Sequence, residues 1–119
     1  MPNRERILCD MTVKELTSLA NFEPICLSEP EREIDGAYVG DLLSWVMGRA
    51  GSGCAWITIM SNINVSAVAL LADVACVILA EGVKPDADML ASAEQKGINV
   101  LCSDKPAYDT AKILCGFGI

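Results

Sequence analysis

The sequence predicts a three-layer α/β/α fold with a mostly parallel central sheet. Three apolar runs, Ala55–Met60, Ala75–Ala80 and Asn99–Cys102, recur about every twenty residues. A short polar loop follows each run, and a segment with helical periodicity follows each loop. Because parallel strands need crossover connections, this repetition indicates successive β-α-β units. In such sheets ligands gather at the carboxyl ends of the strands, where these loops are expected to lie.

The first forty residues predict one short helix and two short strands. Thr12 and Glu15 have the spacing of a capping box, which predicts a helix that runs to about Ala20. Pro24–Leu27 is expected to form a strand. Ile34–Gly40, which has glycines within and at its end, is expected to form another.

Four further helices are expected between and after the apolar runs. Asp41 is the predicted cap of a helix over Leu42–Met47, which Gly48 ends. The next three helices start at Asn62 or Asn64, at Pro85 and Asp86, and at Pro106. Their predicted buried faces are Val65, Val68, Ala69 and Ala72 in the first, Met89 and Ala93 in the second, and Tyr108, Ala111 and Cys115 in the third.

The composition indicates one folded domain over residues 1–119. Apolar residues make up 52% of the chain and the mean hydropathy is +0.37, which excludes a disordered chain. The net charge of −7 and the scattered basic residues argue against nucleic acid as a partner. Acidic residues concentrate between Glu23 and Asp41, where they form either a solvated face or a docking surface for a basic protein.

No segment is expected to enter a membrane or to direct export. Met1–Asp10 mixes charges and lacks the apolar core of a signal peptide. The stretch from Ala50 to Ala80 carries only one charge, Asp73, but polar loops interrupt it before it reaches the ~18 apolar residues of a spanning helix. We therefore expect a cytoplasmic protein with no membrane partner.

Residues suited to catalysis or metal binding are scarce. The chain has no histidine, which removes the usual general base and the commonest zinc ligand. Gly48–Gly53 is rich in glycine but lacks the Gly-Lys-Ser/Thr ending of a phosphate loop. The cysteines form no CxxC pair and are expected to be reduced thiols in the core; they are Cys9, Cys26, Cys54, Cys76, Cys102 and Cys115. We therefore expect no enzyme activity, no metal and no cofactor.

The loops after the three apolar runs hold the candidate ligand-binding residues. These loops are Ser61–Asn64, Glu81–Lys84 and Ser103–Lys105. Amide and carboxylate side chains there can bind a ligand, and the helix that follows the first loop offers free N–H groups. Helix capping is the alternative role, although capping alone does not explain Glu81. The candidates are Asn62, Asn64, Glu81, Gly82, Ser103 and Asp104.

Several segments, taken together, resemble a known family over residues 11–119. They are Met11–Leu16, Ile34–Asp41, Ile78–Gly82 with Pro85, and Gly97–Leu101 with Tyr108–Thr110. This series resembles the DRTGG domain, which is similar to the amino-terminal domain of bacterial HPr kinase/phosphorylase and also occurs beside CBS and phosphotransacetylase domains. Where the family has Gly-Asp-Arg, this chain has Ser61-Asn62-Ile63, and where it has Thr-Gly-Gly, this chain has Ala80-Glu81-Gly82. Only Gly82 matches.

The resemblance implies the fold of the HPr kinase amino-terminal domain and a regulatory or assembly role, often in an oligomer, with no activity of its own. In that enzyme catalysis belongs to a separate phosphate-loop domain. We therefore expect a regulatory module that senses a nucleotide or metabolite and forms a homo-oligomer, with a dimer as the expected form. The alternative is an adaptor without a ligand, which binds a protein partner through its acidic first half and apolar residues such as Leu42, Trp45 and Val46.

Overall fold

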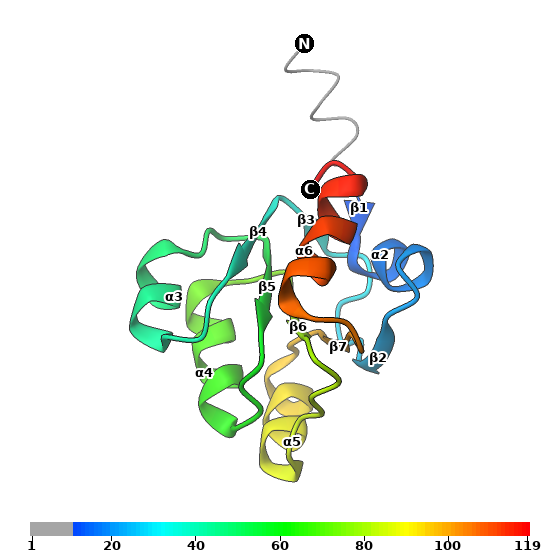
Figure 1. The fold of residues 1–119 in the computed structure, drawn as a ribbon. Helices are drawn as coiled ribbons and strands as arrows, with labels where there is room; N and C mark the ends of the chain where they lie inside the picture. The colour runs from blue at the N-terminus through cyan, green and yellow to red at the C-terminus, as the bar shows by residue number, and fades with distance from the viewer. Residues whose placement is uncertain (1–10) are drawn as a thin grey trace.

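A five-stranded sheet with helices on both faces forms the centre of the molecule in a computed structural model (Figure 1), which describes residues 11–119. The predictions for Cys9 and for Met1–Asp10 lie outside the described residues. In order across the sheet the strands are β2 (Glu23–Cys26), β7 (Val100–Cys102), β6 (Cys76–Leu79), β5 (Cys54–Thr58) and β4 (Gly36–Val39). Strands β4 to β7 are parallel to one another and β2 is antiparallel to β7, which confirms a mostly parallel sheet.

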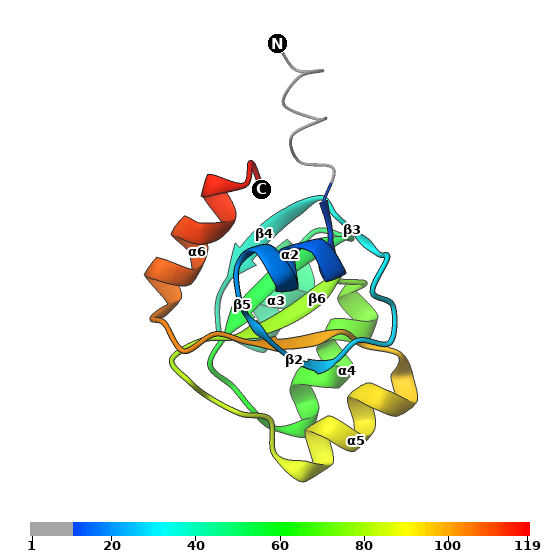
Figure 2. The same ribbon diagram turned by 90° about the vertical axis from the view of Figure 1, so that its right-hand side faces the viewer.

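The helices divide between the two faces of the sheet according to the direction in which the chain crosses it. The parallel strands follow one another in a single direction, so every crossover has the same hand and its helix falls on the same face. These helices are α3 (Leu43–Arg49), α4 (Ile63–Ala72) and α5 (Ala87–Lys96). Helices α2 (Val13–Leu19) and α6 (Ala107–Gly116) cover the other face, and Figure 2 shows the sheet between α6 and the pair α4 and α5. The predicted three-layer fold is confirmed.

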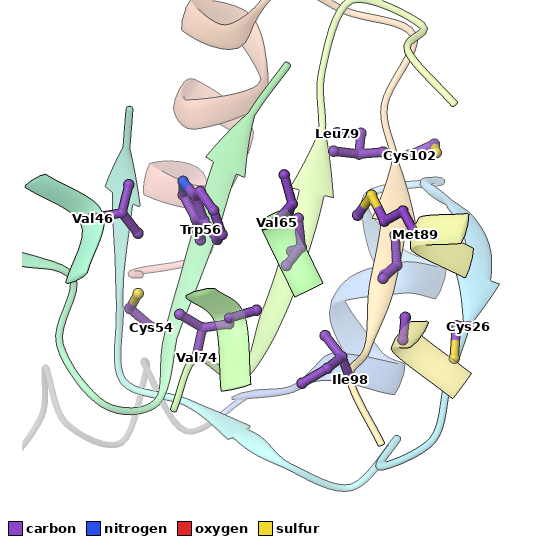
Figure 3. Close-up of a cluster of buried hydrophobic side chains, with 14 residues drawn as sticks. Cys26, Val46, Cys54, Trp56, Val65, Val74, Leu79, Met89, Ile98 and Cys102 are labelled. Atoms are coloured by element: carbon purple, nitrogen blue, oxygen red, sulfur yellow. The ribbon is translucent and has the colours of Figure 1, made fainter. Parts of the chain in front are cut away.

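The central strands are buried on both sides and therefore separate two cores. Trp56 points toward α3–α5, where it packs in the cluster that Figure 3 shows with Val65 and Met89. Its neighbour Ile57 points to the other face, toward α2 and α6. Both side chains are fully buried, as expected for continuous apolar strands covered on two faces. The indole Nε1 of Trp56 donates to the Gly40 carbonyl at 2.8 Å, so this large side chain leaves no buried donor unpaired.

The predicted strand Ile34–Gly40 divides into two strands in different sheets. Glu33–Ile34 (β3) pairs with Met11–Thr12 (β1) in a small antiparallel sheet, whereas Gly36–Val39 joins the large sheet as β4. Asp35 lies between them and donates its backbone N–H to Gly53 at 2.8 Å. The chain thus changes sheets at Asp35, a change that the prediction of one strand over Ile34–Gly40 did not include.

Two details of the predicted α3 are wrong, its cap and its end. Asp41 does not cap the helix, because its carboxylate accepts hydrogen bonds from the Thr58 hydroxyl at 2.6 Å and the Ile59 N–H at 3.2 Å. The helix begins at Leu43 with Leu42 as an N-cap that makes no side-chain hydrogen bond, and it continues through Gly48 to Arg49. A tertiary contact therefore takes the carboxylate that local spacing assigns to the cap.

The predicted buried face of α6 is wrong at two of its three residues, since only Ala111 packs, partly buried, against the core. Tyr108 is 72% exposed and Cys115 is exposed, whereas Thr110 and Leu114 are buried. The Thr110 hydroxyl is paired with the Ser103 hydroxyl at 2.8 Å, so a polar residue occupies a core position of α6. Tyr108 and Cys115, which were predicted to be buried, lie on the exposed side of the helix. In contrast, the capping box at Thr12 is present as predicted.

The apolar faces of the two middle helices and most of the core thiols follow the prediction. Val65 and Ala69 of α4 and Met89 and Ala93 of α5 are buried, while Val68 and Ala72 are partly buried against the same core. Four cysteines are also buried, namely Cys26, Cys54, Cys76 and Cys102, whereas Cys115 is exposed. Within residues 11–119, no helix has the length and apolarity that a bilayer crossing requires.

Candidate functional site

The ends of all five strands meet at one end of the sheet, together with the loops that follow or precede them. The four parallel strands all finish there, and antiparallel β2 begins there. Residues 103–105, after β7, therefore lie beside residues 20–23, at the start of β2. The first half of the chain thus contributes to this end of the sheet.

The loops after β6 and β7 are joined by backbone hydrogen bonds. Glu81 donates its N–H to the Lys105 carbonyl at 2.8 Å, and Gly82 donates to the Ser103 carbonyl at 2.9 Å. On the other side, Asp86 donates to the Ser61 carbonyl at 3.0 Å, which links the same loop to the loop after β5. The three predicted loops are therefore one connected structure.

Glu81 and Gly82 form a tight turn at the end of central strand β6. Their φ angles are 62° and 72°, so two consecutive residues occupy the left-handed region. Glycine adopts this conformation freely, but a residue with a Cβ does so at a cost. Glu81 is exposed, and its carboxylate makes no hydrogen bond or ion pair with the described residues. An exposed, strained acidic residue at this position is a feature that folding alone does not require.

A cavity at this end lies at the edge of the sheet, between the carboxyl end of β7 and the start of β2. It has a volume of about 270 Å³. Its lining residues are Ala20, Asn21, Phe22, Glu23, Lys84, Cys102, Ser103, Asp104 and Lys105. We call this cavity the edge pocket.

The edge pocket contains two lysines and two carboxylates. Lys84 forms a hydrogen-bonded ion pair with Glu23. The hydrogen bond to Glu23 is the largest cause of the raised pKa of Lys84, and the charge of Asp104 raises this pKa by a smaller amount. The Lys105 side chain makes no hydrogen bond or ion pair within residues 11–119. The charges of the lining balance, although the whole chain carries −7.

The deepest polar group of the edge pocket is Ser103, which is 3% exposed. Its hydroxyl pairs with Thr110 at 2.8 Å and accepts the Lys105 N–H at 3.2 Å, so neighbouring groups fix its position. Beside it, burial raises the pKa of the Cys102 thiol, while the ammonium of Lys84 partly offsets this rise. Cys102 is therefore a protonated, weakly reactive thiol at neutral pH.

The predicted site residues separate into two groups. Ser103 and Asp104 line the edge pocket, and Glu81 and Gly82 support it through the backbone without lining it. Asn62 and Asn64 stay at the start of α4, where the Asn62 side chain accepts the Asn64 N–H at 2.9 Å. Asn62 therefore has the capping role that was the alternative.

Sequence reasoning missed the contribution of Asn21 and Glu23 to this pocket. Both come from the turn into β2, which local periodicity cannot place next to β7. Lys84 and Lys105 lie within the predicted loops but were not singled out as candidates. The feature of the sequence that could have identified them is that each of two neighbouring strand-end loops contains a lysine.

The apolar patch predicted for an adaptor is present in part. Leu42 is 57% exposed and Trp45 is 51% exposed, but Val46 is fully buried in the core on the opposite side of α3. The Arg49 guanidinium lies 3.9 Å from the centre of the Trp45 ring, a cation–π contact on the exposed side of the helix.

Comparison with known proteins agrees with this fold. The chain is similar to the CBS and DRTGG domains of the regulatory region of Clostridium perfringens pyrophosphatase, solved with its activator diadenosine tetraphosphate. The TM-score is 0.74 at 13% identity, and the match covers 89% of this chain but only 46% of that one. Among curated proteins, none matches this sequence. A family model, that of the DRTGG domain, matches residues 38–117, and the chain therefore belongs to the DRTGG domain family.

Proposed function

We propose that this chain is a non-catalytic regulatory domain that binds a small molecule in the edge pocket. The observation that carries the proposal is the pocket itself, which places charges of both signs over a fixed serine at the carboxyl end of a parallel strand. The pyrophosphatase region with the same fold is a regulatory region and was solved with a bound activator, which supports a regulatory role here.

The chemistry of the lining supports binding rather than catalysis. The nucleophile candidates are Ser103 and Cys102. The Ser103 hydroxyl is held by Thr110, and the raised pKa of Cys102 keeps its thiol protonated. Neither has a neighbouring histidine, since the chain contains none. Lysines and carboxylates that flank a fixed hydroxyl instead provide donors and acceptors for a bound polar molecule.

The size and charge of the edge pocket favour a small metabolite with both a positive and a negative group. Its volume of about 270 Å³ is below the usual range for drug-sized ligands. Lys84 and Lys105 face Glu23 and Asp104, so a polyphosphate would meet as many like charges as opposite ones. A zwitterion such as an amino acid can pair with the Lys105 ammonium and the Asp104 carboxylate at once.

A thermal-shift screen tests this proposal. The panel contains amino acids, nucleotides, acyl phosphates and common cofactors, each added to the purified chain. A ligand at a hundredfold excess over its Kd stabilises the folded state by about 2.7 kcal/mol. Lys105→Ala and Asp104→Ala should abolish the shift, whereas Lys14→Ala on α2, whose side chain lies outside the edge pocket, should keep it. A panel without any hit, or a hit that survives both pocket substitutions, would contradict the proposal.

A further inference from the structure

The two edges of the large sheet differ in their protection against a further strand. β2 and β4 are the edge strands, because each has a single neighbour in the sheet that residues 11–119 form (Figure 1). β2 contains Pro24, which has no N–H, and its register with β7 shifts between Pro24 and Cys26. A proline and a shifted register are two of the features by which proteins prevent an edge strand from pairing with another chain.

β4 has neither of these features. Its residues, Gly-Ala-Tyr-Val over Gly36–Val39, include no proline and no charge, and all four follow one regular register with β5. Val39 faces the same side of the sheet as its register partner Ile57 and is 50% exposed. Ala37, two residues earlier on the same side, is also exposed. An uncharged, regular and partly apolar edge strand is the kind that pairs readily with another extended chain.

The hydrogen bonds around the start of β4 show which of its backbone groups point away from β5. The Asp35 N–H donates to the Gly53 carbonyl at 2.8 Å, toward β5. Because backbone groups alternate in direction along a strand, the N–H and C=O of Gly36 point to the opposite side. The register partner of Gly36 agrees with this, since the Cys54 carbonyl accepts the Ala75 N–H at 2.7 Å, on the β6 side. We call the side of β4 that faces away from β5 the open edge.

The chain on either side of β4 is acidic. Asp35 precedes the strand and Asp41 follows it, and no lysine or arginine occurs between Arg32 and Arg49. Both aspartates are exposed, and the Asp35 carboxylate makes no hydrogen bond or ion pair within residues 11–119. These charges attract cationic groups at both ends of the strand. A second copy of β4 would bring the same two carboxylates and would be repelled.

We propose that the open edge of β4 binds an extended, basic peptide segment of another protein as an additional strand of the sheet. The backbone groups of Gly36 and of Tyr38, which the same alternation directs to the open edge, hydrogen-bond with the peptide backbone. A peptide side chain beside Val39 covers this exposed residue, and cationic side chains at the ends of the segment pair with Asp35 and Asp41. The open edge and the edge pocket lie at opposite borders of the sheet, so the proposal does not rest on ligand binding.

Fluorescence anisotropy with a labelled synthetic peptide tests the proposal. The probe is Lys-Lys-Val-Thr-Val-Thr-Lys-Lys, and we expect saturable binding to the wild-type chain. Replacement of its lysines by glutamates should weaken binding at least about tenfold. N-methylation of both valines, or of both threonines, removes the N–H groups along one side of the peptide. One of these two methylated probes should bind at least about tenfold more weakly, because only one side of the peptide faces β4.

Gly36→Pro and Gly36→Ala form a matched pair of variants in the chain itself. A Cβ on Gly36 would meet no atom within 4 Å, so alanine fits and keeps the N–H at the open edge. Proline removes this N–H without removing a hydrogen bond to β5. Gly36→Pro should therefore weaken peptide binding at least about tenfold, whereas Gly36→Ala should change it less than about threefold. Circular dichroism verifies that both variants are folded.

Four results would overturn the proposal. They are a failure of the peptide to bind at millimolar concentration, equal binding by wild type and a folded Gly36→Pro variant, and equal binding of both methylated probes and the parent peptide. The fourth is a wild-type dimer that Gly36→Pro dissociates, because a second copy would then occupy the open edge. The methylated probes need no variant, so the test stands even where proline prevents folding. None of these results bears on the edge pocket, whose ligand screen is a separate measurement.

Discussion

Replacing Glu81 by glycine should stabilise the fold, although it removes a side chain. Glu81 holds a φ of 62° in the turn after β6, and its carboxylate has no hydrogen bond or ion pair among residues 11–119 that would be lost. The left-handed conformation costs a residue with a Cβ roughly 1–2 kcal/mol, a cost that glycine does not have.

A part of this gain is cancelled in the unfolded state. Glycine gives the unfolded chain more conformational freedom, which lowers stability by about 0.4–1 kcal/mol. The net expectation for Glu81→Gly is a gain of about 0.5–1 kcal/mol in the free energy of unfolding. For a domain of this size, that gain raises the Tm by roughly 2–5 °C.

The adjacent residue provides a matched control of opposite sign. Gly82 has a φ of 72°, and a Cβ placed on it would meet no atom within 4 Å. Gly82→Ala therefore tests backbone strain without a steric clash and should cost about 1 kcal/mol or more. Urea denaturation followed by circular dichroism measures both changes. A Glu81→Gly variant less stable than wild type would refute the reasoning, because it would reveal a stabilising contact of the Glu81 side chain.

Three further predictions concern groups outside this turn. Hydrogen bonding from Ser52, with a further contribution from Arg32, lowers the pKa of Asp73. The stability of the fold should therefore decrease as the pH drops below about 4. Asp73→Asn should reduce this pH dependence in acid titrations of unfolding. Thr110→Val should cost about 1–3 kcal/mol in urea denaturation, since it leaves the buried Ser103 hydroxyl with only the Lys105 N–H as a partner. In a variant lacking Cys9, a thiol reagent at pH 8 should label Cys115 alone in the folded state, because the other described thiols are buried away from the reagent. Burial also raises the pKa of Cys54 to about 11, which makes that thiol less reactive. Labelling of more than one thiol would contradict this.

The fold was largely predictable because its central strands are short, continuous apolar runs. Runs such as Ala75–Ala80 are typical of strands covered on both faces, and the helices between them require parallel pairing. The partner of β2 was not predictable, because Glu23–Cys26 carries no local mark that distinguishes pairing with β7 from pairing with any other strand. Long-range contacts also changed the roles of Asp41 and Thr110, which bond to residues on other elements.

The sequence pointed to the end of the sheet that holds the proposed edge pocket, but not to the position of that pocket at the sheet's edge. Ligand crevices in parallel sheets form where the strand order reverses, so that neighbouring loops diverge. The parallel strands here run in sequence order without a reversal, and their loops are bonded together instead. The opening arises at the edge, where the turn into antiparallel β2 meets Ser103–Lys105.

The bonded loops extend from the edge pocket across the carboxyl end of the sheet. The edge pocket includes Lys105, whose carbonyl accepts the Glu81 N–H, and the same loop continues to Asp86, which is bonded to Ser61. From there the chain leads back to Ile59, whose N–H is held by Asp41 at the entrance to α3. Hydrogen bonds and short covalent segments therefore alternate across the carboxyl end of the sheet, from the edge pocket to the start of α3.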